Sequence, residues 1–94
     1  MLVVHYEDNP RLIIKNLRSC LARFDKDIGQ VDCHIHYPGK VEIYVEVVEP
    51  QNIKEIIEAC ETYRNDLRQR HGCVLILVSE SLGGPYHILS DKTE

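Results

Sequence analysis

The chain has 94 residues and a mass of 10.9 kDa, a length that supports one hydrophobic core and leaves no room for a second domain. Its composition, 44% hydrophobic and 28% charged, is typical of a folded soluble domain and excludes a disordered chain or a membrane span. A formal net charge of -4 argues against binding nucleic acid through its phosphates. The first residues lack the basic and apolar regions of a signal peptide, which predicts a cytoplasmic protein.

Residues 2–6 are apolar with a β-branched centre and predict a strand. Asn9 can cap a helix that follows, and Pro10 suits its first turn. Apolar residues then recur at helical spacing as far as Asp25, and Gly29 is a plausible stop signal. The sequence therefore predicts a helix over residues 10–25. Its apolar stripe consists of Ile13, Leu17, Cys20, Leu21 and Phe24.

Two segments, 31–37 and 41–47, alternate apolar and polar side chains, so each predicts a half-buried strand. Pro38 and Gly39 between them indicate a hairpin turn. The alternation places the polar side chains of both strands on one face of the hairpin. They are Asp32, His34, His36, Glu42, Tyr44 and Glu46.

The register of this hairpin can be predicted, because a shift of one residue would exchange the two faces. A three-residue loop with a bulge keeps the apolar faces together, with Tyr37 opposite Val41. This register pairs His36 with Glu42. The other polar pairs are His34 with Tyr44 and Asp32 with Glu46.

A second helix is predicted from Pro50 to a stop at Gly72, with basic residues near its end as the helix dipole favours. Its apolar stripe consists of Ile53, Ile56, Ile57, Cys60, Tyr63 and Leu67. Residues 73–79 are continuously apolar in their middle, over 74–78, and predict a strand buried on both faces. A turn then leads to a short fifth strand over 86–89 and a polar tail over 90–94.

The predicted order of elements is βαββαβ, and a shift of the sequence by 40 residues suggests two equivalent halves. Amphipathic patterning alone would give the same correspondence. We predict one α+β domain over residues 1–89, a ferredoxin-like βαββαβ sandwich with an antiparallel sheet in the order 4-1-3-2 and two helices on one face. The shift superposes Pro10 on Pro50, Cys20 on Cys60 and Cys33 on Cys73.

The second face of this sheet stays open, and the 40-residue correspondence assigns apolar side chains of its first and fourth strands to it. They are Leu2, Val4, Tyr6, Val74 and Ile76. An exposed patch of that size is unusual on a small monomer. Either the C-terminal segment, through Tyr86, Ile88 and Leu89, or a second subunit is therefore expected to cover it. We favour a homodimer.

The polar half of the open face carries the candidate chemistry. His34 and His36 point the same way, so with Glu42 they could hold a divalent metal ion. A small enzyme would use a histidine as proton carrier, Glu42 or Asp32 to orient it and Tyr44 as donor. Solvated or interface histidines would show the same alternation. Because no nucleophile or substrate clamp accompanies these residues, a catalytic role is the less expected one.

The four cysteines lack metal-binding spacing and lie on the predicted core stripes, so we expect small buried side chains without a disulfide. Cys20 and Cys60 would approach each other between the helices. Neither glycine-rich phosphate motif occurs, and acids precede both helices, so no nucleotide or other cofactor is expected.

Over residues 10–24 the predicted first helix carries a basic stripe without an acid, Arg11, Lys15, Arg18 and Arg23, and the first half of the second helix exposes acids. These acids are Glu55, Glu58 and Glu61. The stripe either complements the second helix weakly or binds a protein partner. We therefore expect a small non-catalytic interaction or ligand-sensing module that acts as a homodimer through its open sheet face. The alternative is a small enzyme or metal-binding protein that uses His34, His36 and Glu42.

Overall fold

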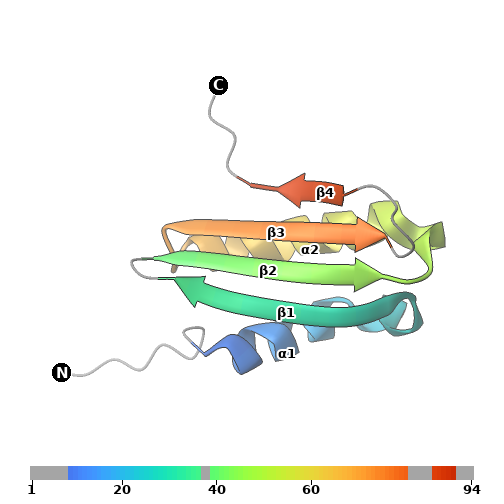
Figure 1. Cartoon of the computed structure of the whole chain (residues 1–94), viewed down its shortest axis with the longest axis horizontal. Helices are drawn as coiled ribbons and strands as arrows, with labels where there is room; N and C mark the ends of the chain where they lie inside the picture. The colour runs from blue at the N-terminus through green and yellow to red at the C-terminus, as the bar shows by residue number, and fades with distance from the viewer. Residues whose placement is uncertain (1–8, 37–38, 81–85, 91–94) are drawn as a thin grey trace.

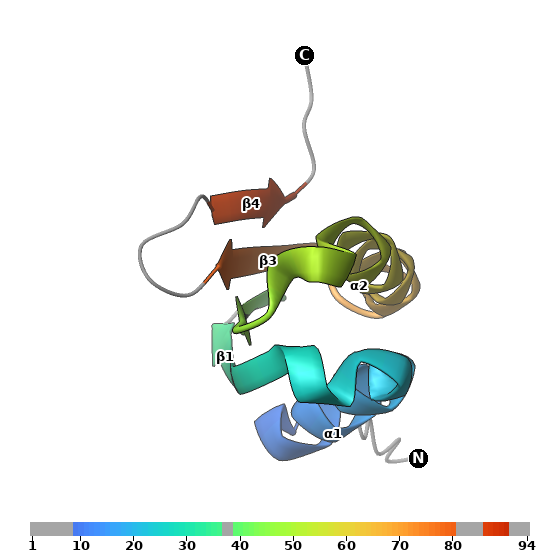
Figure 2. The ribbon, with the colours of Figure 1, turned by 90° about the vertical axis from the view of Figure 1, so that its right-hand side faces the viewer.

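A computed structural model of the chain describes residues 9–36, 39–80 and 86–90. Within them, four strands form one sheet in the order β1-β2-β3-β4. Both α-helices lie against one face of this sheet, and no helix of the described segments lies on the other face (Figures 1 and 2). The elements are α1 (Pro10–Cys20), η2 (Ala22–Asp27), β1 (Ile28–His36), β2 (Lys40–Val47), η3 (Pro50–Asn52), α2 (Ile53–Arg68), β3 (Cys73–Glu80) and β4 (Tyr86–Leu89).

The predicted ferredoxin-like order 4-1-3-2 is wrong. β2 pairs directly with β3, whereas the prediction inserted residues 2–6 between these two strands. Residues 2–6 lie outside the described part of the chain. The sheet is mixed, because β2 and β3 are parallel and the other two pairs are antiparallel. α2 connects the parallel strands, which need a crossover of this kind. The short strand predicted over 86–89 is confirmed as β4, at the edge of β3.

The first helix begins as predicted and ends earlier. The Asn9 side chain accepts a hydrogen bond from the Arg11 backbone N–H at 2.9 Å, and Pro10 occupies the first turn. The α-helix stops at Cys20, and η2 continues the chain with a kink at Phe24. The apolar stripe is buried as predicted except for Cys20, which is exposed.

The core lies between the helices and one face of the sheet, where three strands contribute alternate side chains. Parallel pairing places Val41 beside Val74 and Ile43 beside Ile76. The helices contribute Ile13, Leu17, Ile56, Cys60 and Leu67, and the central strands contribute Val41, Ile43, Val45, Val47, Val74, Ile76 and Val78, each at most 1% exposed.

Val74 and Ile76 were predicted on the open face, and this placement is wrong. Both are fully buried beneath the helices, while Leu75 and Leu77 point to the open face. The error comes from the 40-residue correspondence, which equates Cys33, on the buried face, with Cys73, on the open one. The register with β2 decides the face of β3, because its apolar run has no alternation of its own.

The hairpin has the predicted loop length and the predicted faces in a shifted register. Ile35 pairs with Val41, whereas the prediction placed Ile43 opposite Ile35. Gly39 closes the loop with a φ of 68°, a left-handed conformation that glycine adopts without strain. Tyr37, predicted opposite Val41, lies outside the described residues. The irregularity in the ladder falls at the other end of β1, between Ile28 and Val31.

Two buried polar side chains join separate elements, Arg64 linking α2 to β3 and Asp27 linking η2 to η3. Arg64 of α2 is 3% exposed, and its Nε donates to the Val74 carbonyl oxygen at 2.8 Å. β4 pairs with β3 only from Ile76 onward, so the Val74 carbonyl that accepts this hydrogen bond lies beyond the end of β4. Asp27 accepts a hydrogen bond from the Asn52 side chain at 2.9 Å. None of the described helices is long and apolar enough to span a membrane.

Candidate functional site on the open face of the sheet

The open face consists of alternate side chains from all four strands, and the ladder registers align them in rows across the sheet. Row 1 holds His36, Lys40 and Cys73. Row 2 holds His34, Glu42 and Leu75. Row 3 holds Asp32, Tyr44, Leu77 and Ile88. Row 4 holds Glu46, Ser79 and Tyr86. The polar half of the face thus lies on β1 and β2, and the apolar half lies on β3 and β4.

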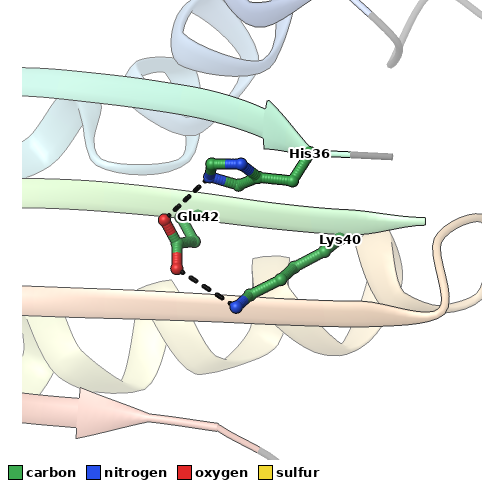
Figure 3. A network of polar contacts seen from close by, with 3 residues as sticks. All are labelled: His36, Lys40 and Glu42. Atoms are coloured by element: carbon green, nitrogen blue, oxygen red, sulfur yellow. Dashed lines mark hydrogen bonds and ion pairs between the residues drawn. The ribbon is translucent and has the colours of Figure 1, made fainter. Parts of the chain in front are cut away.

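Glu42 is the centre of a charged group in rows 1 and 2, as Figure 3 shows. Its Oε1 lies 3.0 Å from His36 Nε2, and its Oε2 lies 3.4 Å from Lys40 Nζ. The hydrogen bond with His36, followed by the contact with Lys40, lowers the pKa of Glu42 below its usual value. Glu42 is therefore a stable carboxylate at neutral pH, suited to orienting a cation or a histidine rather than to donating a proton.

His34 has a different partner from His36. Its ring meets the Tyr44 ring edge-on, with the centroids 6.0 Å apart and the planes at 75°. Both predicted contacts, His36 with Glu42 and His34 with Tyr44, are present, but they join diagonal neighbours because of the shifted register.

The proposed catalytic and metal-binding residues therefore lie on one face as two separate pairs. Within the described segments, no group of three or more His, Cys, Asp and Glu side chains is arranged to hold a metal ion. The proposed metal set of His34, His36 and Glu42 contributes only the contact between His36 and Glu42.

The opposite end of the polar half contains a small acidic hollow of about 220 Å³. The Gln30 backbone N–H donates to Glu46 Oε1 at 3.1 Å, and the Gln30 side chain lies 3.4 Å from the Asp32 carboxylate. Sequence reasoning missed Gln30 because the predicted strand began at Val31, and it missed Ser79 because the prediction assigned Val74 and Ile76, on the opposite face of that strand, to the open side. The hollow is lined by Gln30, Asp32, Tyr44, Val45, Glu46 and Ser79.

The apolar half is formed by different residues from those predicted. Leu75 and Leu77 are half-buried, while Tyr86 and Ile88 are 71% and 59% exposed. β4 extends the open face at its edge and does not fold over it. The other predicted members of this half, Leu2, Val4 and Tyr6, lie outside the described residues.

The cysteines divide into two environments. Cys33 and Cys60 are buried as predicted, and burial raises their pKa values to about 11 and about 12. Cys20 and Cys73 are exposed, so their predicted core placement is wrong. All four thiols are free, and Cys20 lines a hollow together with Ala59 and Tyr63 of α2. The buried thiols are poor nucleophiles, because the thiolate is the reactive form.

Comparisons of this chain with protein-family models, with curated proteins and with solved structures find no match. The arrangement of side chains on the open face is therefore what bears on function.

Proposed function

We propose that the protein is a small cytoplasmic, non-catalytic interaction module that works as a homodimer, with the open sheet faces of two copies packed together. The observation that carries this proposal is the contiguous apolar half of Leu75, Leu77, Tyr86 and Ile88, on a face that no helix of the described residues covers. Facing sheets pack about 10 Å apart, and each large apolar side chain removed from water contributes about 1.5 to 3 kcal/mol. A second copy supplies a matching surface, because a twofold interface uses the same patch twice.

The charges of the polar half favour one orientation of the two copies. Lys40 and His36 lie in row 1, at one end of the strands, and Glu46 lies in row 4, at the other end. A twofold axis parallel to the sheets and perpendicular to the strands places row 1 over row 4 and row 2 over row 3. Lys40 then lies over Glu46 of the second copy, and Leu75 lies over Leu77 of the second copy.

A twofold axis along the strands through the centre of the sheet gives a worse fit. It would place the apolar half of one copy over the polar half of the other. Leu75 would then cover the Glu42 carboxylate and remove it from water while adding no polar contact to those with His36 and Lys40, which is unfavourable. The axis across the strands brings apolar groups together and pairs opposite charges at both ends of the interface.

Charge reversal tests this orientation sharply. Lys40→Glu and Glu46→Lys should each weaken dimerisation, because each places like charges in contact twice in a symmetric dimer. An equimolar mixture of the two variants should restore association, since the heterodimer has two complementary pairs. Sedimentation equilibrium over a range of concentrations measures each dissociation constant. Lys54→Glu and Glu61→Lys on the exposed side of α2 provide the matched control pair and should leave dimerisation unchanged.

Leu77→Lys is a second test, because it places a charge in the apolar half without touching the buried side of β3. It should give a folded monomer, with circular dichroism confirming the fold. A wild-type chain that stays monomeric at millimolar concentration, or a dimer that Leu77→Lys leaves intact, would overturn the proposal.

The second candidate is a small enzyme or metal-binding protein, and the contact between His36 and Glu42 is the observation in its favour. A histidine oriented by a carboxylate is a common feature of metal sites and of acid-base catalysis. A rise in the melting temperature on adding Zn²⁺, lost in His36→Gln and retained in His87→Gln, would favour this candidate. An unchanged melting temperature in the wild type would remove the zinc site.

A further inference from the structure

A second surface, on α1 and η2, forms a shallow hollow of about 700 Å³ with basic side chains along it. Arg11 and Lys15 are exposed, Arg18 is half-buried, and Ile14 lies among these three cations. We name it the basic hollow. Its lining residues are Arg11, Ile14, Lys15, Arg18, Ser19, Ala22 and Asp25.

The charges of the basic hollow are not neutralised within the described chain. No ion pair joins Arg11, Lys15 or Arg18 to an acid among the described residues, and Arg18 Nη2 donates to the Gly29 carbonyl oxygen at 2.7 Å. The glutamates of α2 face elsewhere: Glu55 and Glu58 line a separate hollow, which Arg23 shares. Among the described residues, the acids Glu55 and Glu58 of α2 thus share a hollow with Arg23 and do not line the basic hollow.

The spacing of the cations indicates the shape of a ligand. Arg11, Lys15 and Arg18 follow the helical spacing i, i+4, i+7, so they form one row about 10 Å long on a helix that rises about 1.5 Å per residue. An α-helix with acidic residues at the same spacing presents its carboxylates in a matching row. Ile14 offers it an apolar contact at the centre of the charged row, an arrangement that favours binding.

We propose that the basic hollow docks an acidic amphipathic helix of a partner protein, with acids at i, i+4, i+7 paired to the three cations and an apolar side chain against Ile14 and Ala22. This is the helix-in-groove mode of recognition. Asp25 at one end repels a carboxylate and so limits how far the acidic row extends toward η2.

Two other polyanions fit this surface less well. A membrane would require an apolar helix face, but Ile13 and Leu17 of α1 are fully buried in the core. Nucleic acid binding depends on many phosphate contacts, whereas this row offers three cations on a chain with a net charge of -4. A protein helix needs only these few pairs together with an apolar contact.

The test uses two fluorescein-labelled peptides of about 15 residues with identical composition. One carries glutamates at i, i+4, i+7 around a central leucine, and the other carries them at positions that scatter around the helix. Fluorescence anisotropy with the full chain measures both dissociation constants at low and at moderate salt. The proposal expects the patterned peptide to bind more tightly, with an affinity that falls as salt rises.

Arg11→Gln/Lys15→Gln should weaken binding of the patterned peptide by about fivefold or more. Lys26→Gln/Lys54→Gln removes the same charge from exposed sites outside the basic hollow and should leave the affinity unchanged. Arg18 is kept, because it also bonds to Gly29. The proposal is overturned if the two peptides bind equally, if both double variants lose the same affinity, or if duplex DNA or anionic vesicles bind more tightly than the patterned peptide.

Discussion

Ile76 and Leu77 are consecutive residues of β3, and their side chains lie on opposite faces of the sheet. Ile76 is 0% exposed beneath the helices, and Leu77 is half-buried on the open face, next to Tyr44 in the ladder. The strand is apolar on both sides, but only one side lies in the core of the chain. This difference separates residues that stabilise the monomer from residues available to a second copy.

Replacing the two residues by alanine should therefore have different consequences. Ile76→Ala creates a cavity in the core and should lower the free energy of unfolding by about 2 to 5 kcal/mol. Leu77→Ala should cost clearly less in urea unfolding at low protein concentration, while it weakens self-association at high concentration. Equal losses of stability at low concentration would contradict the assignment of faces.

The carboxylate of Glu42 should titrate below the usual range of a glutamate, because His36 and Lys40 favour its charged form. A folded-state pKa below the unfolded value contributes stability above the unfolded pKa, and this contribution is lost as the pH falls through the folded pKa. NMR of the side-chain carboxyl carbon measures the titration directly. His36→Gln should raise the pKa of Glu42, because it removes the contact between His36 and Glu42. His34→Gln should not, because the His34 ring contacts Tyr44.

Thiol reactivity should separate the cysteines into two classes. Cys20 and Cys73 are exposed and should react with Ellman's reagent in the native protein. Cys33 and Cys60, with pKa values of about 11 and about 12, should react at a comparable rate only after denaturation in guanidinium. If all four thiols reacted equally fast in the native protein, Cys33 in β1 and Cys60 in α2 would not be buried. Cys20→Ser and Cys73→Ser identify the fast sites.

The hydrogen bond from Arg64 to Val74 should contribute to the stability of the sheet at the point where β4 ends. Arg64→Met retains most of the apolar stem but leaves the Val74 carbonyl without this donor, which should cost about 1 to 3 kcal/mol. Lys54→Met, on the exposed side of the same helix, is the control. Amide hydrogen exchange should increase at the start of β3 in Arg64→Met alone. Unchanged exchange there would show that the bond is dispensable.

Several local features followed from the sequence because they depend on neighbouring residues. The cap at Asn9 and the strands on either side of Gly39 are set by short-range geometry, and the structure confirms them. The odd loop length also followed, since only one parity keeps Val41 and Ile43 on the buried face. The exact partner of each residue did not follow from the sequence. The predicted register, with Ile35 opposite Ile43, and the observed register, with Ile35 opposite Val41, both satisfy that parity.

For the candidate site, the sequence likewise predicted which side chains share a face but not every residue of the site. Alternation placed His34, His36, Glu42 and Tyr44 on the open face, and the contacts between them are present. The edges of the site were missed, because Gln30 lies just before the predicted start of its strand and because the prediction turned the other face of the strand of Ser79 to the open side. Whether the two histidines converge on one ligand depends on the direction of each side chain within the face, and the alternation of residues along a strand does not specify that direction.

By itself, the sequence determined the middle of each helix and strand among the described residues and which face of the hairpin is polar, since periods of 3.6 and 2 residues record local geometry. Only the tertiary structure decided the neighbour of β3 and the face it buries. Residues 74–78 are apolar on both sides, so no alternation selects a face. The parallel register with β2, under the cover of α2, places Val74 and Ile76 in the core and leaves Leu75 and Leu77 on the open face.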